Sequence, residues 1–238
     1  WKTLTAVCLL VICMSALSAQ DKSKTNKKRS PNPAFRNVED VDNLPRVLLI
    51  GDSISIGYTL PVRELLKGKA NVHRPSTNCG PTSRGVSGID QWLGKGKWDV
   101  IHFNWGLHDL KYLGPKGENL ADPKAADSHQ QIPPAEYEKN LQLLVKRMKK
   151  TGARLIWCST TPVPSGAKGR VVGDSVKYNQ IALRVMKEHG IAVDDLYAMS
   201  IGKLEKIQRP ANVHFTPEGS RMLAEQVVKS ISRELKKK

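Results

Sequence analysis

The sequence predicts an α/β fold in which a parallel sheet carries helices on both faces. After Pro45, short apolar runs alternate with longer segments whose apolar residues recur every three or four positions. The short runs are typical of buried strands, and the longer period is that of amphipathic helices. Strands that alternate with helices build βαβ units, and such units form a parallel sheet between two helical layers.

Five apolar or β-branched runs are predicted to be the strands of this sheet. The first, RVLLIGD, is strongly apolar and ends in a glycine and an aspartate, so we expect it at the centre of the sheet. The predicted strands are 46–52, 70–75, 98–106, 153–160 and 190–196.

Three apolar stripes with helical spacing are predicted to face the core, within 137–148, 178–186 and 222–235. Thr216 and Pro217 precede the last stripe as an N-cap and a first-turn proline. The polar stretch 110–133 is long for a loop in a compact domain, and we expect it to form a wall or a lid of the functional site.

The first 45 residues differ in composition from the rest of the chain. Lys2, an apolar run and the small residues of SALSA are typical of a secretory signal peptide over 1–19, with cleavage near Ala19. The apolar run is short for a membrane span, so no stable span is expected after cleavage. Residues 20–45 are predicted to be a basic, proline-containing linker, and 46–235 a single domain exported to the periplasm or the extracellular space.

Composition narrows the range of partners and cofactors. The net charge is +16, and part of it lies in the segment 21–36 and in the C-terminal lysines, which we interpret as solvated. No nucleic-acid-binding motif is present, so no nucleic-acid partner is expected. No metal-ligand spacing and no phosphate loop is present, so neither a metal nor a cofactor is expected. Cys79 and Cys158 are predicted to be free thiols.

The carboxyl ends of parallel strands meet at one edge of a sheet, where ligands bind in folds of this class. Ser53 follows the first predicted strand at the start of a helix, where it serves either as an N-cap or as a nucleophile. A nucleophilic serine needs a base, and His214 precedes the last helix on the same side of the sheet. We interpret four other histidines as structural or surface residues: His73, His102, His129 and His189.

Four motifs in order resemble the conserved blocks of the SGNH, or GDSL, hydrolases: GDSIS at 51–55, NCGPTSRG at 78–85, GLHD at 106–109 and VHFTPEG at 213–219. The resemblance implies a flavodoxin-like three-layer αβα sandwich with a five-stranded parallel sheet. It also implies a serine esterase that works through an acyl-enzyme, with Ser53 as nucleophile and His214 as base. The oxyanion donors implied are the backbone N–H groups of Ser53 and Gly80 and a side chain of the third block.

The sequence departs from the family pattern at two places. His108 stands where the third block has asparagine, so either its imidazole or the amide of Asn104 is the expected oxyanion donor. Ala211 stands where the family has the aspartate that orients the catalytic histidine. Asn212, a backbone carbonyl, Asp194 or Asp195 is expected to orient His214 instead, although Asp195 also suits a structural role.

The resemblance points to O-acetylated carbohydrate as substrate, and tryptophans could stack on sugar rings if they are exposed. No single apolar stripe predicts a groove for a long acyl chain. The two departures motivate an alternative, a non-catalytic carbohydrate-binding or surface protein that keeps the fold. A nucleotide-binding module is disfavoured because the phosphate loop is absent.

Overall fold

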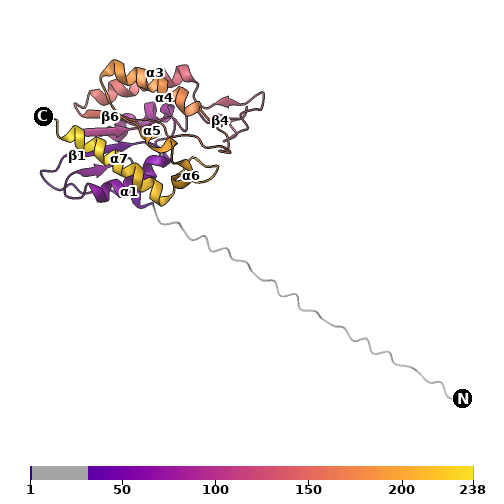
Figure 1. Ribbon diagram of the computed structural model, residues 1–238, viewed down its shortest axis with the longest axis horizontal. Helices are drawn as coiled ribbons and strands as arrows, with labels where there is room; N and C mark the ends of the chain where they lie inside the picture. Colours follow the sequence, from indigo (N-terminus) through magenta and orange to yellow (C-terminus); the bar gives the residue numbers. More distant parts are fainter. Residues whose placement is uncertain (2–31, 238) are drawn as a thin grey trace. The chain divides into compact units, whose positions relative to one another are not determined.

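The protein is described here by a computed structural model that covers Trp1 and residues 32–237. Its main sheet holds five parallel strands in the order β2-β1-β3-β6-β7, which confirms the predicted flavodoxin-like topology (Figure 1). Each strand lies within its predicted run: β1 (Arg46–Ile50), β2 (Asn71–His73), β3 (Val100–Phe103), β6 (Arg154–Cys158) and β7 (Ala192–Asp194).

Helices cover the two faces of the sheet as separate layers (Figure 1). One layer pairs α1 (Ser53–Leu65) with α7 (Pro217–Leu235). The other holds α2 (Thr82–Leu93), α3 (Pro134–Lys149) and α4 (Asp174–His189). Three shorter helices complete the described part: η1 (Pro33–Phe35), α5 (Leu196–Ile201) and α6 (Leu204–Ile207).

The predicted stripes bury their apolar faces against the sheet. The stripe of α3 is fully buried, and so are the inner residues of β1, as expected for a parallel strand covered on both sides. At the start of α7, Thr216 Oγ1 accepts a hydrogen bond from Gly219 N at 3.0 Å and Pro217 is the first helical residue, which confirms the predicted cap. Cys79 and Cys158 are buried free thiols, as predicted.

Small residues let α1 and α7 approach closely. A Cβ atom on Gly57 would lie 3.2 Å from Ser220 Oγ, and one on Gly219 would lie 2.1 Å from the carbonyl oxygen of Ile207. Gly57 therefore lies where α1 contacts α7. Gly219 lies where α7 contacts α6, so a side chain at Gly219 would displace α6.

The stretch 110–133, predicted to be a loop, contains a short antiparallel hairpin of β4 (Tyr112–Leu113) and β5 (His129–Gln130) that projects from the domain (Figure 1). Tyr112 N also donates to Gly169 O at 2.8 Å, so the loop after β6 anchors the hairpin. Strands of two residues are too short to show an alternating pattern, which explains why the sequence did not reveal them.

The predicted signal peptide lies outside the described residues, but the end of the predicted linker does not. Asn71 donates to Val41 O and accepts from Val41 N, both at 2.9 Å, and Asp40 contacts Arg46 at 2.7 Å and His73 at 2.6 Å. Residues 37–45 therefore pack on the domain, contrary to the expectation of a linker with little structure. No helix among the described residues has the length and apolar character needed to cross a bilayer.

Candidate active site

Ser53 lies at the carboxyl end of β1, as the first residue of α1. Asp52 caps this helix, because its Oδ1 accepts a hydrogen bond from Ile54 N at 2.9 Å. A Cβ atom on Gly51 would lie 2.9 Å from Ser55 Cβ, so the turn between strand and helix is too tight for a larger residue. The motif thus serves to hold the Ser53 hydroxyl at the edge of the sheet.

His214 lies in the loop before α7, and its ring reaches Ser53. The Nε2 atom is 2.8 Å from Ser53 Oγ, and Nδ1 is 2.7 Å from Asn212 Oδ1. The same amide oxygen accepts a hydrogen bond from His214 N at 3.0 Å, which fixes its orientation. Because an amide oxygen only accepts, Nδ1 holds the proton and Nε2 is free to accept the proton of Ser53.

The surroundings keep His214 in its neutral form. Burial lowers the pKa of the imidazole, and the positive charges of Arg209 and Arg170 lower it further against the opposing charge of Asp52. A neutral imidazole at neutral pH is the form that a general base requires.

Among the residues expected to orient His214, the structure brings only Asn212 to the ring. Asp195 accepts from Ser159 Oγ at 2.8 Å and caps α5 through Ala198 N at 3.0 Å, so it does not orient His214 and has the structural role that was also expected. Asp194 binds His102 at 2.9 Å inside the core. Ala211 has a φ of 51°, a left-handed turn that presents the next residue, Asn212, to the imidazole.

The two backbone N–H groups expected to bind the oxyanion, those of Ser53 and Gly80, differ in the hydrogen bonds that they make in this structure. Ser53 N–H is in the first turn of α1, and no hydrogen bond joins it to another described residue, which leaves it available to an oxyanion. Gly80 N–H donates to Asn78 Oδ1 at 2.9 Å, in a turn where Gly80 has a φ of 59°. Gly80 can therefore bind an oxyanion only if the Asn78 side chain moves away.

The structure separates the two candidates of the third block. Asn104 donates to Cys158 O at 2.7 Å and approaches Thr160 Oγ1 at 3.5 Å, so its amide ties β3 to β6. This placement corrects the expectation that Asn104 is an oxyanion donor. His108 is half-buried, and the pKa of its ring is lowered by burial and by the charges of Lys111 and Arg170, against the opposing charge of Asp52. Its neutral ring carries one N–H donor.

Sequence reasoning missed Arg74, whose buried guanidinium lies beneath the nucleophile turn. Its Nη1 donates to Ser55 Oγ at 3.1 Å and to Thr59 Oγ1 at 2.9 Å, and its Nη2 donates to Gly51 O at 3.3 Å. A buried charge must be hydrogen-bonded, so Arg74 and this turn hold each other in place. The signal in the sequence was a single arginine at the end of a strand.

Asp109 connects the second and third motifs. Its Oδ1 accepts hydrogen bonds from Thr82 N at 2.8 Å and Thr82 Oγ1 at 2.5 Å. Burial raises the pKa of this carboxyl from 3.8 to about 7, since the charged form loses its water. Asp109 thereby fixes the start of α2, next to Gly80, against the loop that holds His108.

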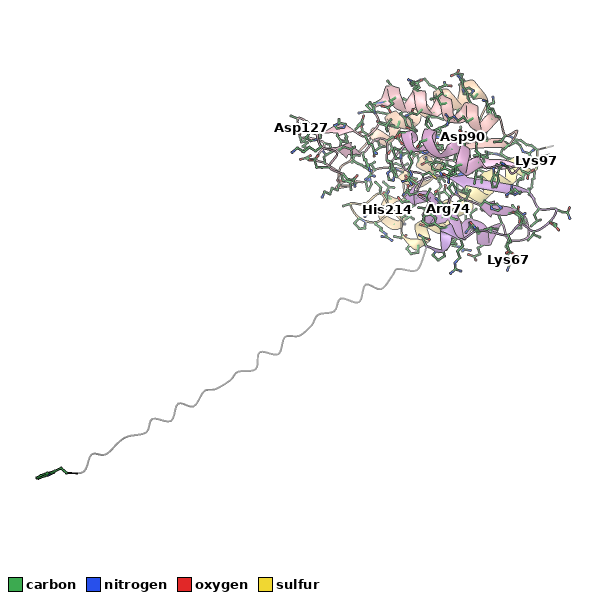
Figure 2. The ribbon with its side chains drawn as sticks, turned by 180° about the vertical axis from the view of Figure 1, so that it is seen from behind. Lys67, Arg74, Asp90, Lys97, Asp127 and His214 are labelled. Atoms are coloured by element: carbon green, nitrogen blue, oxygen red, sulfur yellow. The ribbon has the colours of Figure 1, made fainter. Side chains whose placement is uncertain are left out.

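A cavity of about 400 Å³ opens beside Ser53 and His214. Much of its wall is apolar and comes from α1 and the segment before α7, including Ile54, Leu60 and Phe215. No tryptophan lines it, since Trp105 and Trp157 are fully buried and Trp92 and Trp98 line a different cavity. Figure 2 shows His214 before α7 and Asp127 on the projecting hairpin.

Among the described residues, one cluster has the residue types of a metal site: His102, Cys158 and Asp194, all buried. Both carboxylate oxygens of Asp194 are already hydrogen-bonded. Oδ2 bonds to His102 Nε2, and Oδ1 accepts from Gln226 Nε2 at 3.1 Å. The cluster ties β3 and β7 to α7 within the core.

Comparisons with known proteins identify the family and the fold of this chain. The sequence model of the GDSL-like lipase/acylhydrolase family matches residues 49–222. The search of curated proteins found no match. Among solved structures of similar fold, an acetyl xylan esterase, AlAXEase, has a TM-score of 0.64 at 15% identity over 78% of this chain and 99% of its own. A lipase/acylhydrolase from Enterococcus faecalis has a TM-score of 0.64 at 19% identity, covering 80% of this chain and 96% of its own. An esterase, EstA, from Pseudoalteromonas sp. has a TM-score of 0.61 at 12% identity over 81% and 99%.

Proposed function

Because the chain belongs to the GDSL-like lipase/acylhydrolase family and is a serine ester hydrolase, we propose that Ser53 is its nucleophile and His214 its general base. The observation that supports these roles is the 2.8 Å contact between Ser53 Oγ and His214 Nε2. A contact of this length allows direct proton transfer as the serine oxygen attacks an ester carbonyl.

The reaction proceeds in two steps. In the first, the Ser53 proton moves to His214 Nε2 while Oγ bonds to the carbonyl carbon. The alcohol then leaves with that proton, and the acyl group stays on Ser53. In the second, a water gives its proton to His214 and attacks the acyl carbon, which releases the acid and returns the proton to Ser53.

Asn212 orients the imidazole in place of a carboxylate. Its amide oxygen selects the tautomer with the proton on Nδ1, as a carboxylate would, but it adds no negative charge to stabilise the imidazolium. The missing aspartate was one motive for the alternative of a non-catalytic protein, and Asn212 makes the orienting contact in place of that aspartate.

The oxyanion would be held by Ser53 N–H and by the His108 imidazole, with Gly80 N–H joining when Asn78 releases it. Each donor of this kind is worth about 10²–10³ in rate. Three donors from three motifs would enclose the tetrahedral intermediate at the carboxyl edge of the sheet.

Acetyl esters of carbohydrate are the substrates that we propose first. The acetyl xylan esterase of similar fold supports this choice by analogy alone. The wall of Ile54, Leu60 and Phe215 favours a second candidate, an ester with a longer acyl chain. The sequence did not suggest this groove, because two segments far apart in the chain build it. We further propose that the protein acts after export, given the composition of residues 1–19.

The test uses p-nitrophenyl esters of increasing acyl length, together with a serine-directed phosphonate probe. Wild-type protein should hydrolyse the acetate and take up the probe at Ser53, and Ser53→Ala should do neither. Ser87→Ala, at an exposed position of α2 outside the catalytic cavity, is the matched control. A folded wild type that neither hydrolyses the ester nor binds the probe would exclude the proposed roles. Faster turnover of the octanoate than of the acetate would favour the second candidate.

A further inference from the structure

Four cationic side chains from four segments lie at or near the site, and we call them the basic rim: Arg84, Lys111, Arg170 and Arg209. Arg209 lines the cavity of Ser53, and its backbone N–H donates to the backbone carbonyl of His214 at 2.9 Å. Arg84 lies over Gly80, since a Cβ atom there would be 3.0 Å from Arg84 Cδ. The rim thus reaches both the base and one of the expected oxyanion donors.

Arg170 and Lys111 form the part of the rim next to His108. Arg170 Nε donates to Leu107 O at 3.0 Å, which holds the guanidinium against the turn that contains His108. Both side chains are half-buried, and the charge of each acts on the His108 ring. The charge of Arg170 also lowers the pKa of His214, so it influences the rings of both histidines.

The basic rim lacks acidic partners within residues 32–237. None of its four side chains takes part in an ion pair there, whereas arginines elsewhere on the surface, such as Arg184 and Arg221, contact glutamates. The acid whose charge acts on His108, His214 and Arg170 is Asp52. Its carboxylate is buried and caps α1, so it is not placed to neutralise the rim.

We propose that the substrate carries a carboxylate or sulfate near the scissile ester, and that the basic rim, Arg170 above all, binds this anion. The inference rests on the proposed function, whose substrate it specifies as an acylated anionic carbohydrate. A guanidinium held by its Nε still presents donors on its two Nη atoms, and such a fork matches the oxygens of a carboxylate or sulfate. Concentrated positive charge at a cleft also speeds the arrival of anionic substrates.

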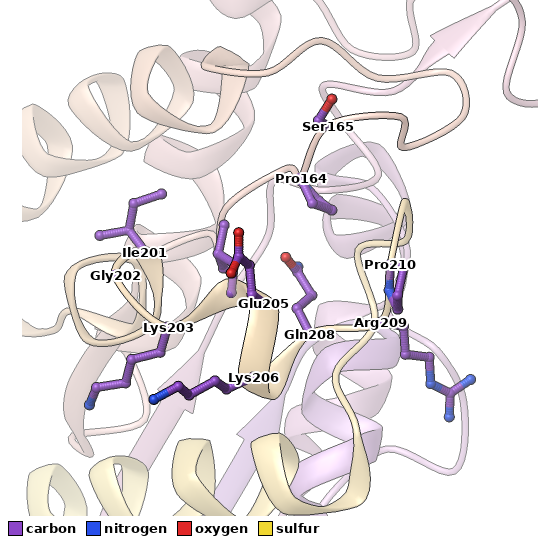
Figure 3. A pocket seen from close by; sticks show the side chains of 11 residues that line it. Pro164, Ser165, Ile201, Gly202, Lys203, Glu205, Lys206, Gln208, Arg209 and Pro210 are labelled. Carbon is purple, nitrogen blue, oxygen red and sulfur yellow. The ribbon is translucent and has the colours of Figure 1, made fainter.

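A second cavity extends the positive surface beyond the basic rim. It has a volume of about 650 Å³ and shares Arg209 with the catalytic cavity. Figure 3 shows Lys203 and Lys206 on the short segment around α6, with their amines pointing to the same side. Glu205 is the acid among its lining residues. A chain of acidic sugars could therefore continue from Ser53 past Arg209 into this space.

The experiment compares two substrates that differ in one charge. They are a methyl glucuronoside and a methyl glucoside, each acetylated at the same ring hydroxyl, and acetate release gives kcat/KM. At low ionic strength we expect the anionic ester to be preferred by about tenfold or more. The preference should fall toward one in about 0.5 M NaCl, where charges are screened within a few ångströms. Arg170→Gln should reduce the preference at least several-fold, and the charge-matched control Arg184→Gln should retain it.

The outcomes separate this inference from the proposed function. Hydrolysis of p-nitrophenyl acetate with labelling of Ser53, but without preference for the anionic ester, would overturn the inference alone. The inference alone would also be overturned if neither glycoside were cleaved, or if the preference did not change with salt or with Arg170→Gln. Loss of both p-nitrophenyl acetate hydrolysis and labelling would instead refute the proposed function itself.

Discussion

Replacing Asn212 by aspartate tests how His214 is oriented and what the missing charge costs. The two side chains have nearly the same shape, so the carboxylate can keep both acceptor contacts, at 2.7 Å to Nδ1 and at 3.0 Å to His214 N. The substitution therefore adds a negative charge beside the imidazole with little change in geometry.

The size of the effect follows from the position of this contact at the surface. Two opposite unit charges about 4 Å apart attract with about 1 kcal/mol in water and about 4 kcal/mol in a partly buried setting. Asn212 is exposed and His214 is half-buried, so we take about 1–2 kcal/mol. This energy raises the pKa of His214 by roughly 0.7–1.5 units and stabilises the imidazolium of the transition state to a similar extent.

We expect Asn212→Asp to raise kcat for p-nitrophenyl acetate about five- to thirty-fold at pH 8, where the base stays neutral. The acidic limb of the kcat/KM profile should move up by about one pH unit, because this limb follows the pKa of His214 in the free enzyme. The assay is the rate measured between pH 4.5 and 8.5.

Asn212→Ala provides the control, since it removes the acceptor and should lower kcat. If the acidic limb of Asn212→Asp coincides with that of the wild type, the ring does not contact residue 212 in solution. The mechanism would then need another orienting group.

Three further predictions concern other contacts of the site and the fold. His108→Ala should lower kcat about 10²–10³-fold with little change in KM, as expected for a donor to the oxyanion. An unchanged kcat in steady-state assays would show that His108 does not bind the oxyanion. Because the pKa of Asp109 rises from 3.8 in the unfolded chain to about 7 on folding, its contribution to stability is complete below pH 4 and is lost as the pH rises toward 7. Urea unfolding should therefore show Asp109→Asn gaining on the wild type between pH 5 and pH 8, and a constant difference would contradict this pKa. Gly219→Ala should destabilise the protein by about 1–3 kcal/mol in urea unfolding, although alanine normally favours a helix, because its Cβ would meet Ile207 O; an unchanged midpoint would show that α6 yields freely.

The sheet and the pairing of Ser53 with His214 could be predicted because both depend on strong local patterns. Apolar runs bounded by turn residues identify parallel strands, and the end of such a strand tells on which edge a side chain emerges. Ser53 and His214 each follow or precede an element with a clear pattern, so topology placed both at one edge of the sheet. The resemblance to the family then assigned their pairing across 161 residues.

The roles of Asn104 and Gly80 depend on neighbours that no local pattern reveals. Asn104 has the right chemistry for an oxyanion donor, but the carbonyl of Cys158 on the adjacent strand takes its amide. Gly80 has the right backbone, but Asn78 occupies its N–H. In both cases a partner within hydrogen-bond distance decides the role, and partners on other strands or within a turn are set by tertiary structure.

The position of Arg74 and the apolar wall of the catalytic cavity were also missed, because both depend on how distant segments pack together. The sequence gives no sign that the Arg74 guanidinium turns inward to Gly51 O, because arginine is usually exposed. The groove combines side chains of α1 with those before α7, so neither segment displays it alone.

The close packing of α1 on α7 has a consequence for when this protein can act. Ser53 is synthesised well before His214, and the contact of the two helices holds the two residues together. A nascent chain in which α7 has not yet packed on α1 would contain both residues but would not hold the imidazole beside the serine. Hydrolytic activity would therefore begin only when α7 has folded onto α1.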